Sequence, residues 1–572
     1  MKARRATLAA TAALFALSAA ACSGGPSTTS PGNQHGSNEP KAGSTTSAGL
    51  PTTDYTKLPY DQVKQGGTLT LAIGQLPNNW NNNTADGQLA DTSTMEGPML
   101  GSGVNYAADG SWKLNPDYAT SIKVTSDKPT VIDVKINPKA VWSDGTPITA
   151  ADMISYWKAQ NGTNKKYNVA GTTCFEDIKN VKQVGSDTKH YTVTFDSAYA
   201  EWQACVWPDL PKAVTGTPTD YNTTYKAKMY PSDGPYIVSK VDQNAGVITE
   251  VPNPKWWGRK AKLDKIVFRV IDQSGLGQAF ANGEVNMIDT GAQVDVLKQA
   301  ESKAGSVVQR SGGTTYTQLT INAQSGPLKN INVRHALFYA INRQQFASIT
   351  QKGLGVPPVT VGSNILLPGQ AGYANTEDAM YPYSKAKAQA ALKAAGYTIQ
   401  NGKAMKGGQQ LTLSIVTPTG TPTNNQRCQL VQNYLGQVGI KVTIKDVPSA
   451  KYFSDYVVIG PSKNFELTSF SWVGGALPIS GSKSIFTPAN SGQNYAGIST
   501  PQIGQLFKKA SETLDPTQRD AILRQTDKAI YTEAPMVTFT ATPNILVTDG
   551  NLVNLGATQF ETTDWTQVGF KS

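Results

Sequence analysis

The chain has 572 residues, of which 39 % are hydrophobic. It is too long for one ordinary hydrophobic core, so at least two lobes are expected. The formal net charge is +10 at pH 7, but lysine and arginine are scattered, with no run of four and no aromatic-rich basic motif. This distribution argues against a nucleic-acid partner and fits a solvated surface with some attraction to anionic lipid.

The N-terminal segment has the pattern of a signal peptide. Residues 1–5 are basic, and residues 6–21 are uncharged and rich in Ala and Leu, too short a stretch to span a bilayer comfortably. The following Ala-Ala-Ala-Cys sequence, residues 19–22, resembles a bacterial lipobox, in which the cysteine thiol carries diacylglycerol. We therefore expect a signal peptide at 1–21 and lipid attachment at Cys22, with a plain secretory signal and a chance cysteine as the alternative.

A polar stretch separates this segment from the first strand. From Ser23 to about Thr56 the chain is mostly Ser, Thr, Gly, Pro and Asn, which bury too little apolar surface to offset the entropy of ordering. Residues 22–65 are predicted to be the lipidated cysteine and a disordered tether. Residues 66–74 then read as the first strand, because Leu, Leu and Ile alternate along it.

Strands and helices are mixed along the rest of the chain. Residues 130–137 and 264–271 alternate apolar and polar side chains, which predicts strands. Residues 332–350 have apolar side chains at helical spacing, and residues 384–395 begin at a capping serine and end before Gly396, which predicts two helices. The fold class is therefore α/β, or mixed α+β, and the sequence contains no short repeat and no second hydrophobic span.

Three cysteines remain beyond Cys22. In an oxidising compartment a bridge between Cys174 and Cys205 is expected, and closing that loop would stabilise the fold by roughly 3–4 kcal/mol. Cys428 would then be a buried free thiol. The sequence by itself does not fix the connectivity.

Residues 141–153, Val-Trp-Ser-Asp-Gly-Thr-Pro-Ile-Thr-Ala-Ala-Asp-Met, carry the most specific motif. Asp144 and the glycine after it fit a tight turn, and Thr149 can cap a helix whose first turn contains Asp152, so these carboxylates are structural and not catalytic. The segment resembles the solute-binding proteins of family 5, the oligopeptide, dipeptide and nickel type. Further matches follow in the family's order: residues 115–119, 234–238, 253–258, 282–286, 319–322, 328–337, 385–397 and 438–442.

The resemblance implies a two-lobed periplasmic-binding-protein fold of class II, or cluster C, that closes over a ligand. Lobe one would comprise residues 66–310 and 530–572, with an extra subdomain at 96–229, and lobe two would comprise residues 311–529. It also implies an extracytoplasmic lipoprotein, anchored to the outer face of the cell membrane, that delivers oligopeptides to the permease subunits of an ABC importer and acts as a monomer.

Candidate ligand residues come partly from the same resemblance. Peptide-binding members carry Trp-x-x-Asp in lobe two, with the carboxylate against the peptide's α-ammonium; here Trp472 is present and Gly475 stands at the Asp position. The predicted ligand contacts are Trp472, Tyr495, Asn322, Trp80 and Asn81. Core packing is the alternative for Trp472, Tyr495 and Asn322, and an exposed turn is the alternative for the Asn-rich loop that contains Trp80 and Asn81.

The chain lacks the motifs of an enzyme. It has no nucleophile elbow, no zinc-protease motif, no Walker loop and no dinucleotide fingerprint, and its three histidines have no paired spacing. No cofactor and no metal site are expected. The alternatives to peptide import are a non-peptide solute (a metal chelate, a sugar or a modified peptide), a receptor for a peptide signal and, more remotely, a secreted hydrolase.

Overall fold

The computed structural model describes residues 49–457 and 465–572. The predicted signal peptide, Cys22 and the tether before residue 49 lie outside the described residues. Within residues 49–65 the chain is already part of the fold: β1 (Thr53–Asp54) pairs with β22 (Ala557–Thr558), and Val63 is buried. The predicted end of the tether at residue 65 is therefore too late, because a short polar segment gains order here from a partner strand near the other end of the chain.

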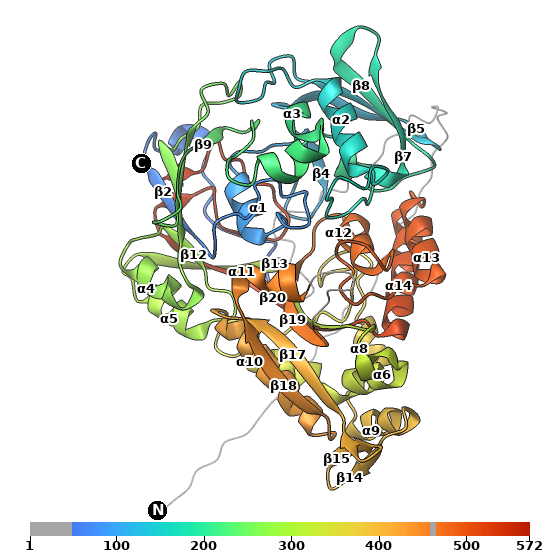
Figure 1. Ribbon diagram of the computed structural model, residues 1–572. Coiled ribbons are helices and arrows are strands. Elements are labelled where there is room, and N and C mark those ends of the chain that lie inside the picture. Colours follow the sequence, from blue (N-terminus) through green and yellow to red (C-terminus); the bar gives the residue numbers. More distant parts are fainter. Residues whose placement is uncertain (1–48, 458–464) are drawn as a thin grey trace, which may run out of the picture. The chain divides into compact units, whose positions relative to one another are not determined.

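One sheet runs through both lobes (Figure 1). Its strands, in spatial order, are β18 (Lys441–Val447), β17 (Thr412–Pro418), β19 (Leu467–Val473), β13 (Ser306–Ile321), β20 (Met536–Asp549), β12 (Met287–Asp289), β2 (Thr68–Ile73), β11 (Lys265–Val270), β10 (Val247–Pro252) and β9 (Tyr236–Asp242). The first three belong to lobe two and the last five to lobe one. The long antiparallel strands β13 and β20 cross between the lobes.

The pairing of β13 with β20 is irregular at the crossing. Its register shifts between Ser311 and Thr315 and again between Tyr316 and Gln318. Bulges bend a strand and strengthen its local twist. The two strands therefore change direction where they pass from one lobe to the other.

The hydrophobic core of lobe one includes the strands predicted at residues 66–74 and 264–271. Leu69, Leu71 and Ile73 of β2 are all buried on one side, as the alternation predicts. In β11 Ile266 and Phe268 are fully buried, whereas the third predicted member, Val270, is 36 % exposed because the strand ends there. Helices α4 (Leu276–Ala281) and α5 (Val294–Glu301) pack with β12 and β20 in a second cluster.

The extra subdomain has its own antiparallel sheet, seen in the upper part of Figure 1. The strand order is β5 (Ala119–Asp127), β6 (Thr130–Ile136), β8 (Asp187–Phe195) and β7 (Ile178–Val184), with α2 (Ala150–Gln160) packed against it. The hydrophobic cluster of this subdomain is continuous with the core of lobe one. Cys174 and Cys205 form the predicted disulfide, with 6.0 Å between their Cα atoms, and Cys428 is a buried free thiol.

The motif at residues 141–153 has the structural role that its sequence predicts. The backbone N–H of Thr146 donates to the Asp144 carboxylate at 2.9 Å, and Gly145 has a φ of +89°, where side chains are disfavoured. Asp152 accepts from the backbone N–H of Thr149 at 2.8 Å, which fixes the start of α2. Both carboxylates therefore accept hydrogen bonds from backbone N–H groups.

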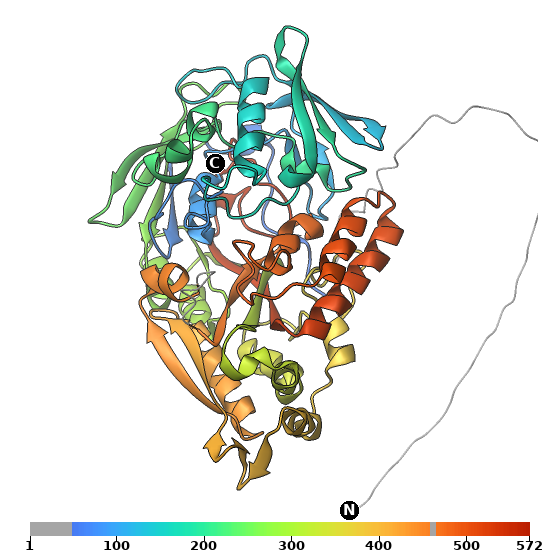
Figure 2. The same ribbon diagram turned by 45° about the vertical axis from the view of Figure 1, so that its right-hand side comes forward.

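Lobe two packs helices on both faces of its strands. They are α6 (Ile331–Ala340), α7 (Arg343–Thr350), α8 (Thr376–Met380), α9 (Lys385–Ala394), α10 (Pro422–Gly436), α12 (Pro478–Phe486), α13 (Pro501–Ser511) and α14 (Pro516–Glu533). Helices α13 and α14 lie side by side in both views (Figures 1 and 2). The predicted helix at 384–395 is confirmed as α9, with the hydroxyl of Ser384 accepting from the N–H of Lys387.

One helix boundary differs from the sequence prediction. The single helix predicted at 332–350 is two helices, because Ile341 is extended and buried and the side chain of Asn342 caps α7. The family resemblance places the return to lobe one at residue 530; Tyr531, Val537 and Phe539, which follow it, pack in the same hydrophobic cluster as Leu319 and Leu337.

Candidate functional site

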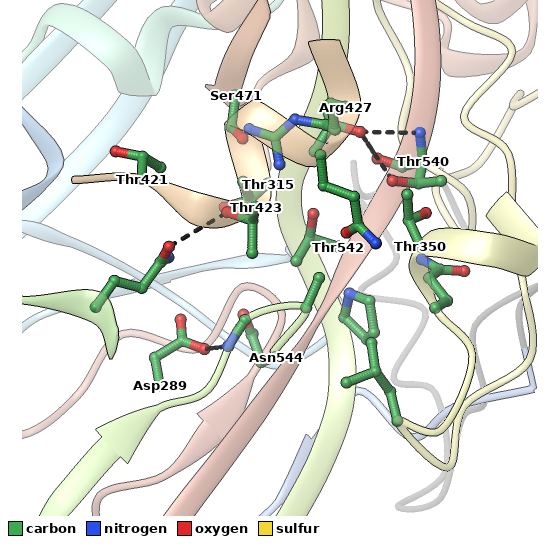
Figure 3. A pocket seen from close by; sticks show the side chains of 18 residues that line it. Asp289, Thr315, Thr350, Thr421, Thr423, Arg427, Ser471, Thr540, Thr542 and Asn544 are labelled. Atoms are coloured by element: carbon green, nitrogen blue, oxygen red, sulfur yellow. Dashed lines mark hydrogen bonds between the residues drawn. The ribbon is translucent and has the colours of Figure 1, made fainter. Parts of the chain in front are cut away.

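A cavity of about 220 Å³ lies between the lobes, beside the crossing strands (Figure 3). Its lobe-one wall contains Gln273, just after β11, and Asp289, at the end of β12. Its lobe-two wall contains Thr423 and Arg427 of α10 and Ser471 of β19. The floor is a row of hydroxyl side chains from β13 and β20: Thr315, Thr317, Thr540 and Thr542. The cavity is thus lined by many polar side chains, and both lobes contribute to it.

Arg427 is the cation of this cavity. Its side chain is 8 % exposed, and its Nη2 donates to Asn424 Oδ1 at 2.6 Å, while its Nε is buried without a hydrogen-bond partner among the described residues. Burial lowers the pKa of Arg427 to about 10, so the guanidinium is charged at neutral pH.

Asp289 is the carboxylate of the opposite wall (Figure 3). It accepts from the backbone N–H of Gly291 at 2.8 Å and is open to the cavity. The surrounding protein raises the pKa of Asp289 by desolvation, and the bond from Gly291 partly offsets that rise. The site therefore presents one basic and one acidic side chain on different lobes.

Strand β19 has an unpaired edge at the same cavity. It pairs with β13 from Leu467 to Val473, but with β17 only at Leu467 and Thr468. In the part of the chain that the structure describes, residues 469–473 have no strand on the β17 side. Ser471 on this edge lines the cavity, and Val473 is 57 % exposed.

The structure brings two of the predicted ligand residues together. The rings of Trp472 and Tyr495 stack, with centroids 5.7 Å apart and planes 14° from parallel, and Phe470 packs edge-on against Trp472. Both side chains are half-buried, and Trp472 Nε1 has no hydrogen-bond partner among the described residues. Since side chains alternate along a strand, Trp472 lies on the face of β19 opposite Ser471.

Two further predicted residues, Trp80 and Asn81, are buried and make contacts within the protein. Trp80 is 1 % exposed in the core of lobe one. The fully buried Asn81 donates to the carbonyl of Tyr221 at 2.9 Å and accepts from the N–H of Asn83 at 3.1 Å. The Asn-rich loop bonds to its own backbone through such Asx turns, so these amides do not face a ligand.

Both polar atoms of the Asn322 side-chain amide likewise have hydrogen-bond partners within the protein. It is 3 % exposed, donates to the carbonyl of Phe465 at 2.8 Å and accepts from the N–H of Gln324 at 3.1 Å. Trp80, Asn81 and Asn322 do not line the cavity beside the crossing strands, and neither do Trp472 and Tyr495. We assign Trp80, Asn81 and Asn322 to structure, because all three are buried inside the fold.

Arg427 was not among the predicted ligand residues, although a signal for it exists in the sequence. Along α10 the buried residues are Asn424, Arg427, Cys428, Val431, Tyr434 and Leu435. Arg427 therefore lies on the buried face of α10, among residues that are mostly apolar. Such a position is unusual for a charged side chain unless a partner is present.

The lobes also touch beyond the cavity. Glu201 of the extra subdomain accepts from the backbone N–H groups of Ile479 and Ser480, at 2.9 and 2.7 Å, at the start of α12. Lys483 of the same helix pairs with Glu176 of the extra subdomain. A second cavity of about 280 Å³ lies beside this contact, with Tyr106 and Glu201 on one side and Arg519 on the other.

The described residues contain no group of three or more His, Cys, Asp and Glu side chains arranged to hold a metal ion. No helix among residues 49–457 and 465–572 is long and apolar enough to cross a membrane.

Comparison with known proteins adds a family and a fold. Residues 113–494 match the family model of the bacterial extracellular solute-binding proteins, family 5 middle region. The oligopeptide-binding protein OppA of Mycobacterium bovis is 31 % identical over 524 residues, which cover 91 % of this chain and 87 % of OppA.

Two solved structures superpose on nearly the whole chain. The periplasmic EDTA-binding protein EppA has a TM-score of 0.80 and 27 % identity, covering 91 % of this chain and 98 % of EppA. The oligopeptide-binding protein AppA of Bacillus subtilis, solved with a nonapeptide, has a TM-score of 0.77 and 20 % identity, covering 89 % of this chain and all of AppA. The mixed α/β fold predicted from the sequence is confirmed.

Proposed function

Since this chain belongs to the bacterial extracellular solute-binding proteins of family 5, which are binding proteins and not enzymes, we propose that it captures oligopeptides between its lobes and delivers them to an ABC permease. The observation that carries the ligand class is the unpaired edge of β19 at the interlobe cavity. An extended peptide pairs with such an edge through main-chain hydrogen bonds that do not depend on its sequence. The name of the OppA relative supports the same ligand class.

The side chains beside this edge suit an extended peptide. Trp472 has a half-buried ring, and its buried indole N–H has no protein partner in the described residues. The threonine hydroxyls of the crossing strands both donate and accept hydrogen bonds, as the alternating amides of a peptide require. Both lobes contribute to the cavity, so ligand contacts are complete only when the lobes are closed, and the ligand stabilises the closed state.

We also propose that the protein is held at the outer face of the cell membrane by a lipid on Cys22, after removal of residues 1–21. The support is the basic, apolar and small-residue pattern of the first 22 residues. Two acyl chains give nearly permanent anchoring, at roughly 0.8 kcal/mol for each buried methylene. Mass spectrometry of Cys22 in membrane extracts would test this; an unmodified Cys22 in secreted protein would contradict it.

A polycarboxylate chelate is the second candidate ligand. EppA, 27 % identical, is described as an EDTA-binding protein, and the cavity here contains a buried arginine without a carboxylate partner in the described residues. A chelate would bring its own metal ligands, so no metal-binding cluster in the protein is needed.

The test is to identify what the protein carries. Residues 23–572, which keep β1 and its pairing with β22, are purified under native conditions, and the small molecules released on denaturation are identified by mass spectrometry. Peptides of mixed sequence are the expected result, because an edge that binds main chain tolerates many side chains. A single non-peptide solute or a metal chelate would contradict peptide capture and leave the family assignment in place.

A further inference from the structure

The positive charge of the chain is concentrated in one segment of lobe two. Residues 379–445 contain seven lysines and one arginine and no aspartate or glutamate. The formal charge of the whole chain is +10, and three of these charges lie in residues 1–5, so the rest of the chain is close to neutral. A solvated surface normally intersperses acidic and basic side chains. The segment at 379–445 does not follow that pattern.

Six of these lysines lie on three neighbouring elements of lobe two. The elements are α9, β15 (Lys403–Lys406), which pairs with β14 (Thr398–Gln400), and β18. In Figure 1 α9, β14 and β15 lie together at one end of lobe two. We call this group the basic tip; it consists of Lys385, Lys387 and Lys393 of α9, Lys403 and Lys406 of β15, and Lys441 at the start of β18.

Hydrogen bonds connect the three elements of the basic tip. Lys406 Nζ donates to the carbonyl of Ala395, just after α9, at 2.9 Å. The backbone N–H of Ala404 donates to the carbonyl of Gly439, just before β18, at 3.0 Å. The tip is therefore one continuous surface and not three separate ones.

The lysines of the basic tip are exposed, and none of them forms an ion pair within the described residues. By contrast, Lys57 pairs with Glu561 at 2.6 Å, and Lys508 pairs with Glu512 at 2.9 Å. Like charges on one surface repel each other, so the tip has a positive potential that no acidic side chain of the segment reduces.

The start of α9 adds to this positive potential. Lys385 and Lys387 lie in its first turn, which contains no acidic residue, whereas the first turn of α2 contains Asp152. The N-terminal end of a helix carries partial positive charge, so cations there are unfavourable for the helix itself. Tyr383, 39 % exposed, comes just before the helix, and tyrosine is enriched where a membrane meets water. These features suit an anionic surface better than free solvent.

We propose that the basic tip binds the anionic lipid headgroups of the cell membrane and holds this end of lobe two against the bilayer. Anionic lipid attracts clustered lysines near the surface, and the attraction decreases within a Debye length. The contact goes beyond the proposed anchor, because it fixes which end of the folded chain faces the bilayer. It does not depend on the identity of the solute in the cavity.

The proposed lipid on Cys22 makes the membrane the nearest anionic surface. The chain between Cys22 and residue 49 can span at most about 90 Å. A folded chain of this length has a radius of gyration of about 24 Å. The anchor therefore leaves enough chain for the basic tip to reach the bilayer.

The first experiment measures binding to vesicles without the anchor. Residues 23–572 are mixed with vesicles of phosphatidylcholine alone or of phosphatidylcholine with phosphatidylglycerol, and the bound protein is quantified by co-sedimentation. Binding is expected only to the vesicles that contain phosphatidylglycerol. It should be lost at about 1 M salt, where the Debye length is about 3 Å instead of about 10 Å at about 0.1 M.

Two variants locate the surface that binds. The tip variant replaces four lysines with glutamine: Lys385→Gln, Lys387→Gln, Lys403→Gln and Lys441→Gln. The matched control replaces four exposed lysines of the extra subdomain that likewise form no ion pair within the described residues: Lys123→Gln, Lys139→Gln, Lys179→Gln and Lys182→Gln. Both variants lose the same formal charge.

The tip variant is expected to bind the anionic vesicles at least about 10-fold more weakly than the wild type. The control should bind like the wild type, because charges more than a Debye length from the surface are screened. The unfolding midpoint of the tip variant should not fall, since Lys385 and Lys387 oppose the dipole of α9. Solute affinity in solution should be unchanged in both variants, because these lysines do not line the interlobe cavity.

Three results would overturn the inference. One is a wild type that does not bind the vesicles containing phosphatidylglycerol. Another is equal weakening in the tip variant and the control, which would make the binding a property of net charge alone. The third is a wild type that binds inorganic polyphosphate but not the vesicles, which would assign the basic tip to an anionic polymer. None of the three bears on solute capture, which the identification of the released small molecules tests separately.

Discussion

Gly475 leaves open space at the position where peptide-binding relatives of this sequence pattern carry aspartate. A Cβ built on Gly475 meets no atom within 4 Å, and its φ is not in the positive range that would exclude a side chain. Its carbonyl accepts from Gln370 Nε2 at 2.9 Å, a bond that a side chain does not disturb. The absence of the aspartate is therefore not imposed by packing.

This geometry makes Gly475→Asp a gain-of-function test. We expect it to strengthen binding of peptides with a free α-ammonium about 10-fold, through a charge-assisted hydrogen bond, with little effect on N-acetylated peptides. Isothermal titration calorimetry with both peptide forms measures the difference, and Gly475→Asn is the uncharged control. Equal gains for free and acetylated peptides would argue against an ammonium contact at this position.

Two tryptophans test the assignment of site and core. Trp472→Ala is expected to weaken peptide binding about 10-fold or more while the unfolding midpoint changes little, since the half-buried ring belongs to the strand whose edge is unpaired and stacks on Tyr495. Trp80→Ala should instead cost about 3–5 kcal/mol of stability, as a buried core residue, and leave the affinity of the folded fraction unchanged. Thermal unfolding and calorimetry measure both effects. A large loss of stability in Trp472→Ala, or a loss of affinity in folded Trp80→Ala, would contradict these assignments.

At the scale of elements, the extra subdomain and lobe one bury carboxyl groups without cations. Burial raises the pKa of Glu96 to about 8, helped by the charge of Asp209 and opposed by a hydrogen bond from Tyr230. Burial also raises the pKa of Asp209 to about 6. Neither oxygen of the fully buried Glu250 has a hydrogen-bond partner among the described residues.

These groups predict a stability that falls as pH rises. The folded state keeps the Glu96 proton up to about pH 8, whereas the unfolded chain releases it near the ordinary glutamate pKa of 4.5. The folded state therefore binds more protons between these values, and its stabilisation, complete below pH 4.5, is lost as pH rises through 8. Unfolding midpoints from about pH 4 to about pH 9 measure this, and Glu96→Gln should flatten the curve. A midpoint that rises across the range would contradict the buried-acid interpretation.

Local patterns predicted several elements correctly because their causes are local. The alternation of Leu69, Leu71 and Ile73 puts one face of β2 in the core, and Ser384 with Gly396 marks both ends of α9. The helix predicted at 332–350 is split because Asn342 starts a new helix at a position that the apolar period alone does not mark. The capping side chain of Asn342, and not the apolar periodicity, determines where the second helix begins.

At the scale of the whole molecule, the contact between Glu201 and the start of α12 holds the extra subdomain against lobe two. Glu201 is 4 % exposed and accepts two backbone N–H groups, an arrangement that also suits the positive end of the helix. The disulfide partner Cys205 lies a few residues further on, so this part of the chain is held close to its covalent cross-link.

Glu201→Ala is expected to shift the ligand-free protein toward an open arrangement of the lobes. Small-angle scattering should record a larger radius of gyration, and peptide affinity should fall because closure becomes less favourable. Glu284→Ala, at an exposed glutamate of lobe one, is the matched control. An unchanged radius and affinity in Glu201→Ala would show that this contact does not contribute to closure.

Local sequence patterns are sufficient to predict the mixed α/β class, the family resemblance, the presence of Trp472 with glycine in place of aspartate at position 475, and the structural role of the motif at residues 141–153. All of these depend on neighbouring residues, whose spacing records turns, caps and alternation. The tertiary structure creates the cavity, because the cavity walls join positions as distant in sequence as Gln273, Arg427 and Asn544. It also turned the Asn-rich loop inward, since amides pair with whichever backbone groups the fold brings near, and local sequence does not specify those partners.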